Sequence, residues 1–105
     1  MIDDIIKEFE EVNRLIMNSS CSQETKEEFF NIVNDYIEKS KTFETDCKEI
    51  KIKLKHTDFQ LLSILKSIKP LFDSSIINQE ELIQSELKNL KRLYRQFLII
   101  IGITE

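Results

Sequence analysis

The chain has 105 residues, of which 41% are hydrophobic and 32% charged, so it is too apolar for a disordered segment and long enough for one domain. It holds one glycine and one proline, which argues against a sheet protein, because sheets and tight turns depend on residues with permissive or fixed backbone angles. The net charge of −4 argues against a general nucleic-acid-binding protein.

The first predicted helix covers about residues 2–17. Its apolar residues follow one another at intervals of three and four, the spacing that returns side chains to one face of a helix. They are Ile2, Ile5, Phe9, Val12 and Ile16. A mostly polar run from Asn18 to Ser22 ends the pattern, because short polar side chains compete with the helix for backbone hydrogen bonds.

A second apolar ladder with the same spacing runs from Phe29 to Leu71, and no glycine or proline interrupts it before Pro70. It favours one helix over about residues 23–69, capped at Ser22 or Thr25, of a length typical of coiled coils. Two alternatives stay open, a break near 40–46 or a break near 55–57, because both regions contain residues that cap helices. Either break would turn three helices into four.

The third predicted helix covers about residues 79–101. Asn78 caps its start, acidic residues fill its first turn, and Gly102 ends it. Its apolar stripe consists of Ile83, Leu87, Leu90, Tyr94, Phe97 and Ile101. The connection before it spans residues 71–77.

The expected fold is all-α, with residues 1–105 in a single helical domain. Three long amphipathic helices, or four if the middle one is broken, pack in an antiparallel, coiled-coil-like bundle. Doubled apolar positions such as Phe29-Phe30 and Leu61-Leu62 make the stripes wider than a two-stranded seam. We therefore expect more apolar helical surface than the chain can cover by itself, and partner helices or a second copy to bury the remainder.

Charge divides the sequence into two halves. Residues 1–49 carry 13 acidic and 6 basic side chains, whereas residues 50–105 carry 6 acidic and 9 basic ones. Opposite charges attract, so this pattern indicates that the two halves meet, within one chain or between two.

The residues needed for catalysis or for binding a cofactor are missing. The only histidine, His56, has no cysteine or carboxylate at a spacing suited to nucleophilic or metal chemistry, and a single glycine cannot form a phosphate-binding loop. We expect no enzyme, catalytic residue, cofactor, metal or small-molecule substrate. Cys21 and Cys47 are interpreted as reduced thiols, with Cys47 packed as a small hydrophobe.

The sequence favours an intracellular, cytoplasmic protein and leaves the nucleus open, because no signal peptide pattern precedes the two cysteines and both are interpreted as reduced. No apolar run approaches the ~20 residues of a membrane span. Two surfaces of the third helix are candidates for function. The partner-binding candidate is the apolar set Leu87, Leu90, Tyr94, Phe97, Leu98 and Ile101. The basic-face candidate is Lys88, Lys91, Arg92 and Arg95, four residues that share one side of a helix.

Three hypotheses for function follow. The leading one is a non-catalytic interaction subunit or adaptor of a multiprotein assembly, which binds partner helices or itself through the apolar stripes. The alternative is a small monomeric inhibitor or immunity-type protein with an acidic binding surface around Asp3, Asp4, Glu8 and Glu11. The third is contact of the basic face with a membrane surface or with nucleic acid, the latter disfavoured by the net charge.

Overall fold

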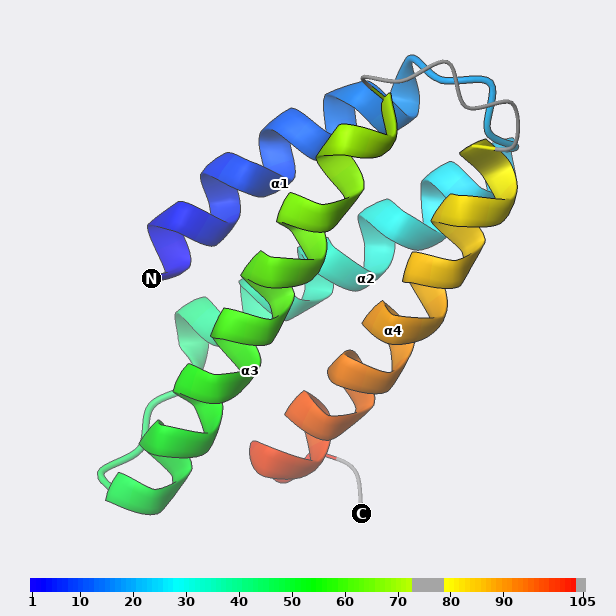
Figure 1. The fold of residues 1–105 in the computed structure, drawn as a ribbon. Coiled ribbons are helices and arrows are strands. Elements are labelled where there is room, and N and C mark those ends of the chain that lie inside the picture. Colours follow the sequence, from blue (N-terminus) through cyan, green and yellow to red (C-terminus); the bar gives the residue numbers. More distant parts are fainter. Residues whose placement is uncertain (73–78, 104–105) are drawn as a thin grey trace.

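The computed structural model describes residues 1–72 and 79–103, which form four α-helices and one short 3-10 helix and contain no strand. These elements are α1 (Ile2–Met17), α2 (Gln23–Thr42), α3 (Lys48–Ile68), η1 (Lys69–Phe72) and α4 (Gln79–Ile100). Figure 1 shows that successive helices run in opposite directions. The all-α prediction is therefore confirmed.

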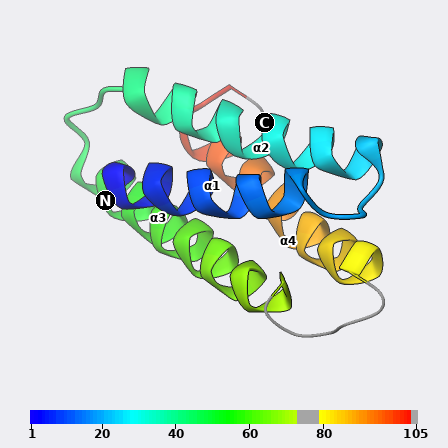
Figure 2. The same cartoon turned by 90° about the horizontal axis from the view of Figure 1, so that it is seen from above.

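The helices occupy the four corners of a bundle. α1 packs beside α2 and α3, and α4 also packs beside α2 and α3, so α2 and α3 lie on opposite corners. Neighbours within the α1/α2 and α3/α4 pairs are antiparallel, whereas α1 and α3, like α2 and α4, run parallel (Figure 1 and Figure 2). The radius of gyration is 14.2 Å, near the roughly 13 Å of a compact domain of this length.

The long middle helix favoured by the sequence does not form, because the chain breaks in the alternative region near 40–46. Phe43 ends α2 with extended backbone angles (φ −80°, ψ 129°). The Thr42 hydroxyl donates to the carbonyl of Lys39, and the Cys47 N–H donates to Thr45 Oγ1 at 3.1 Å. These local bonds replace some of the helical bonds lost at the break.

The chain does not break near 55–57, the other alternative that the sequence left open. Thr57 lies inside α3, where its hydroxyl donates to the carbonyl of Leu54 at 2.8 Å instead of capping a helix. The expected packing of Cys47 was also wrong, because this residue lies at the exposed start of α3, whereas Cys21 is buried.

The break explains how the chain covers its own stripes. With α2 and α3 as separate helices, four amphipathic faces meet in one core that contains every stripe residue of α1 from Ile5 to Ile16 and extends to Phe97. Phe9 packs beside Phe29, with ring centroids 5.7 Å apart, and Tyr36 packs on Phe97 at 4.1 Å. The expected surplus of apolar surface is therefore smaller than the sequence indicated.

The helix ends follow their capping residues. Ser22 is the N-cap of α2, and its Oγ accepts a hydrogen bond from the Thr25 N–H at 3.2 Å. Gly102 has φ +81°. Its N–H donates to the Ile99 carbonyl and the N–H of Ile103 donates to the Leu98 carbonyl, the pair of hydrogen bonds that commonly ends a helix at glycine. The expected cap Asn78 lies outside the described residues.

Candidate interaction surface

The apolar set predicted to bind a partner is built into the bundle instead. Leu87, Leu90 and Phe97 are fully buried, and the remaining three, Tyr94, Leu98 and Ile101, are half-buried against the same core. For Leu87, Leu90 and Phe97 the expectation was wrong, because the separated α2 and α3 cover this part of α4 from within the chain. For the three half-buried residues it stays a prediction. Of the apolar end of α4, Ile99 is the most exposed residue, at 50%.

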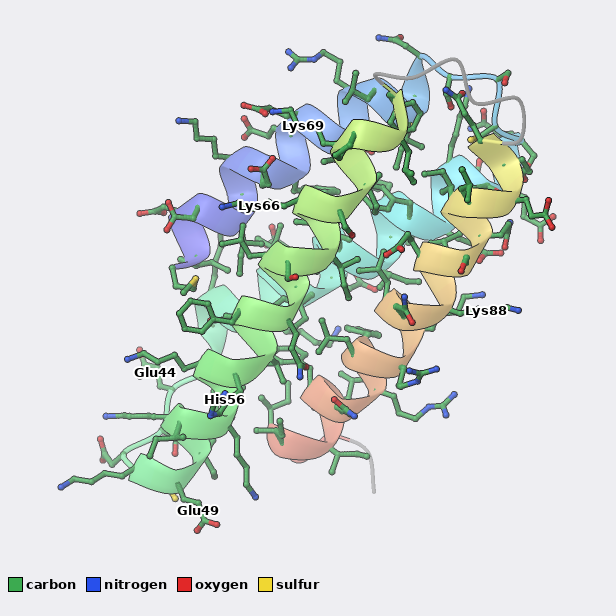
Figure 3. The ribbon with its side chains drawn as sticks, viewed as in Figure 1. Glu44, Glu49, His56, Lys66, Lys69 and Lys88 are labelled. Atoms are coloured by element: carbon green, nitrogen blue, oxygen red, sulfur yellow. The ribbon has the colours of Figure 1, made fainter. Side chains whose placement is uncertain are left out.

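The predicted basic face is on the surface. Lys88, Lys91, Arg92 and Arg95 are all exposed. Lys91 reaches α2, where its Nζ lies 2.9 Å from Glu28 Oε2, whereas the other three form no ion pair with a described residue. Figure 3 shows Lys88 pointing away from the bundle. Three of the four predicted cations are therefore available to a partner.

The folded bundle separates charge between its two antiparallel pairs. α1 and α2 carry ten acidic and five basic side chains, whereas α3, η1 and α4 carry five acidic and ten basic ones. Seven of these ten bases form no ion pair with a described residue, namely Lys48, Lys51, Lys55, Lys66, Lys88, Arg92 and Arg95. The α3/α4 side is therefore the basic side of the molecule.

The two sides attract each other along the seams where they meet. Lys69 of η1 pairs with Glu11 of α1, and Lys91 pairs with Glu28 across the α2/α4 seam. The hydrogen bond and charge of Lys69 lower the pKa of Glu11. Both pairs join the acidic half of the sequence to its basic half, which confirms that the halves meet within one chain.

A groove between α1 and α3 has balanced charge. Three acids and three lysines line it beside Leu62, namely Asp4, Glu8, Glu11, Lys7, Lys66 and Lys69. Figure 3 shows Lys66 and Lys69 lying toward α1. The lysines of α3 and η1 thus face much of the acidic surface that the sequence offered as a binding site.

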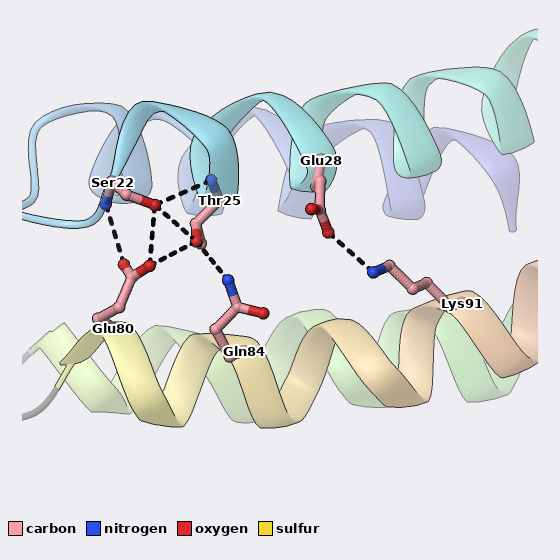
Figure 4. A network of polar contacts seen from close by, with 6 residues as sticks. All are labelled: Ser22, Thr25, Glu28, Glu80, Gln84 and Lys91. Atoms are coloured by element: carbon pink, nitrogen blue, oxygen red, sulfur yellow. Dashed lines mark hydrogen bonds and ion pairs between the residues drawn. The ribbon is translucent and has the colours of Figure 1, made fainter.

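The α2/α4 seam begins with a polar network that has a structural explanation (Figure 4). The Glu80 carboxylate accepts hydrogen bonds from the Ser22 N–H at 2.9 Å and from the Thr25 hydroxyl at 2.6 Å, while Gln84 Nε2 donates to Thr25 Oγ1. The bond from Thr25, followed by that from the Ser22 N–H, lowers the pKa of Glu80 from 4.5 to about 2. A carboxylate of α4 therefore completes the N-terminal cap of α2.

A second polar cluster links α2 to α3. The Tyr36 hydroxyl donates to Asp58 Oδ1 at 2.5 Å and lies 2.9 Å from Thr57 Oγ1. Burial, followed by the hydrogen bond to Asp58, raises the pKa of Tyr36 far above its usual value, and burial also raises the pKa of Asp58. The adjoining cavity, about 80 Å³ beside Ser40 and Asp58, has room for a few water molecules and not for a metabolite.

A groove lies between α3 and α4 on the basic side. Its volume is about 400 Å³, and its lining residues are Gln60, Ser63, Ile64, Asn89, Arg92, Leu93 and Gln96. We call it the amide groove, after its three carboxamide side chains. Among the described residues that line it, Arg92 is the only charged one and none is acidic.

Sequence reasoning identified Arg92 and missed the carboxamides of this groove. Gln60, Asn89 and Gln96 each directly precede a buried residue of their own helix, so each stands at the edge of an apolar stripe. In a chain with 32% charged residues, the uncharged polar residues at the edges of the apolar stripes of α3 and α4 could have indicated the groove. Pairing the two edges required knowledge that α3 and α4 are neighbours.

Residues with reactive side chains do not come together. His56 is exposed on α3, and Cys47 is exposed at the start of the same helix. Cys21 is buried, and this burial raises the pKa of its thiol. In residues 1–72 and 79–103 no three histidine, cysteine or acidic side chains are grouped so that they could hold a metal ion. None of the described helices combines the length and apolarity that crossing a membrane requires.

Comparison of the chain with protein-family models, with curated proteins and with solved structures finds no match. Evidence for function therefore comes from the charge, exposure and grooves of the bundle itself.

Proposed function

We propose that the chain is a non-catalytic binding module that attaches to an acidic protein partner through its α3/α4 side. The observation that carries this proposal is the excess of unpaired basic side chains on that side. Ten bases and five acids belong to α3, η1 and α4, and only three of the bases form ion pairs with described residues. Such a surface attracts acidic partners and orients their approach.

Five of the seven bases without an ion pair to a described residue lie toward one end of the bundle. α3 and α4 are antiparallel, so the start of α3 lies beside the end of α4, at the lower end in Figure 1. Lys48, Lys51 and Lys55 belong to the first half of α3, and Arg92 and Arg95 to the second half of α4. Cations of both helices therefore lie at this end of the bundle.

Apolar side chains stand among these cations. Ile52 and Phe59 of α3 are 59% and 55% exposed, and because they are seven residues apart they share one face of the helix. Protein interfaces combine a few large apolar anchors with a charged rim. This combination favours a protein surface over a purely electrostatic partner such as a nucleic-acid backbone.

The inhibitor-like alternative, which needs a free acidic surface, receives less support. Asp4, Glu8 and Glu11 line the α1/α3 groove together with three lysines of the same chain. Glu11 is already paired with Lys69. A partner would have to displace this ion pair before it could bind Glu11.

The test is retention of a partner by the purified protein, compared with two charge-reversal variants. The double variant Arg92→Glu/Arg95→Glu reverses the basic side, and Arg14→Glu/Lys26→Glu changes the same charge on the acidic side. We expect wild type and the second variant to retain the same protein in a salt-sensitive manner, and the first variant to lose it. Equal retention by both variants would refute the proposal.

A further inference from the structure

We propose that the amide groove between α3 and α4 holds an extended, acidic segment of the partner's polypeptide chain. This inference rests on the proposed function, because it names the part of the partner that the basic side receives. It also adds a chemical requirement, since the groove would recognise the peptide main chain as well as negative charge.

The size of the groove fits a short stretch of extended chain. Its α4 wall runs from Asn89 to Gln96, which corresponds to roughly 10 Å along a helix. An extended peptide advances about 3.3 Å per residue, so about three residues lie along this wall. The volume of about 400 Å³ is within the range of sites that hold small ligands or peptide segments.

The carboxamides supply the means to bind a main chain. Each carboxamide side chain of Gln60, Asn89 and Gln96 has an oxygen that accepts and an NH₂ group that donates hydrogen bonds. None of the three is hydrogen-bonded through its side chain to another described residue. A peptide main chain presents N–H and C=O groups in alternation, and carboxamides from both walls satisfy both kinds of group.

The charge of the groove selects an acidic segment. Arg92 is the only charged residue among the described residues of the lining, and a guanidinium binds a carboxylate through two parallel hydrogen bonds. The α1/α3 groove provides the contrast, because its three lysines are balanced by three acids. The floor of the amide groove, Ile64 and Leu93, offers apolar contact to the backbone and to the aliphatic part of a glutamate side chain.

The experiment compares two polyanions that have the same carboxylates and differ in their main chain. Poly-L-glutamate has a peptide main chain, whereas polyacrylate has none. We expect poly-L-glutamate at neutral pH to shift the side-chain NH₂ signals of Gln60, Asn89 and Gln96 in nitrogen-15 NMR spectra. Polyacrylate should shift the signals of the basic residues and leave the three carboxamide signals in place.

Paired variants then test the carboxamides themselves. Gln60→Leu/Gln96→Leu removes two carboxamides from exposed positions without changing charge, and Gln23→Leu makes the same change at the exposed start of α2. Loss of two hydrogen bonds should weaken poly-L-glutamate binding about tenfold, while polyacrylate binding and the Gln23→Leu control stay unchanged. Far-ultraviolet circular dichroism confirms that each variant is folded.

The possible failures are distinguishable. If both polyanions shift the same signals, or if the double leucine variant binds poly-L-glutamate as wild type does, the groove does not read a main chain. The proposed function survives that result as long as Arg92→Glu/Arg95→Glu loses its partner. If the charge-reversal variant also retains the partner, both proposals are wrong.

Discussion

The hydroxyl of Tyr36 lies 2.5 Å from Asp58 Oδ1, and this bond ties α2 to α3, the two helices that occupy opposite corners of the bundle. The ring of Tyr36 also packs on Phe97 of α4. One side chain therefore joins three helices at the end of the bundle where the chain turns through residues 43–47. The bond helps to fix the position of α3 after the break.

Removal of this bond should destabilise the protein. Tyr36→Phe keeps the ring on Phe97 and leaves the partly buried Asp58 carboxylate without its donor, so the free energy of unfolding should fall by about 1–2 kcal/mol. Urea denaturation measures the difference. Tyr94→Phe is the matched control, because the Tyr94 hydroxyl makes no hydrogen bond with a described residue, and it should leave stability nearly unchanged. Equal effects of the two substitutions would contradict the role of the bond.

Alkaline pH should act through the same tyrosine. Burial raises the pKa of Tyr36 in the folded protein, so its contribution to stability is present below the unfolded pKa of about 10 and is lost as the pH rises above it. The expected loss approaches about 1.4 kcal/mol per pH unit. Urea denaturation between about pH 9 and about pH 12 should show that the free energy of unfolding declines less steeply in Tyr36→Phe than in wild type. Parallel declines would mean that Tyr36 ionises freely in the fold.

Acid should weaken the cap at the α2/α4 seam. The pKa of Glu80 is lowered from 4.5 to about 2, so its contribution to stability is present above 4.5 and is lost as the pH falls toward 2. At neutral pH, Glu80→Gln should cost about 1 kcal/mol, a value reduced by the solvent exposure of the site. Glu81→Gln, its neighbour in the same first turn, removes the same charge near the helix start without touching Ser22 or Thr25. Chemical denaturation at several pH values should show an acid-dependent loss that Glu80→Gln lacks and Glu81→Gln keeps.

The buried stripe of α4 should determine folding and not assembly. Leu90 is 1% exposed, so Leu90→Asp places a charge in the core and should cost more than about 4 kcal/mol, enough to unfold the chain. Ile99→Asp makes the same change at a half-exposed position and should alter stability by less than about 0.5 kcal/mol. Thermal unfolding followed by circular dichroism separates the two. A helical, cooperatively melting Leu90→Asp protein would show that this stripe is not the core.

Periodicity and capping residues predicted most of the helical content. The stripe of α1 lies in the core as its spacing indicates, and Gly102 ends the last helix with the positive φ that glycine favours. Both features depend on residues close together in sequence, so local rules suffice for them. The contact between the acidic and basic halves was also predictable, because residues 1–49 and residues 50–105 carry opposite net charges.

The break between α2 and α3 was the main source of error. The 4-3 ladder continues through Phe43 and Cys47, so periodicity alone cannot distinguish a long helix from two shorter ones. The decision depends on how much apolar surface each arrangement buries, which is a property of the whole chain. Assignment of Leu87, Leu90 and Phe97 to a partner followed from that error. The amide groove was missed for a related reason, since its walls belong to helices whose adjacency only the fold reveals.

Site-specific photo-crosslinking in cells can identify which side of the bundle contacts a partner. A photoreactive amino acid is placed at Arg92 or Lys55 on the basic side, or at Glu10 or Glu24 on the acidic side, in cells that express the chain. All four positions are exposed, so each of the four variants should fold as the unmodified chain does. We expect covalent adducts with a protein from the two basic-side positions, attached at an acidic segment of that protein. Adducts formed only from the acidic-side positions, or attached at a basic segment, would contradict this expectation.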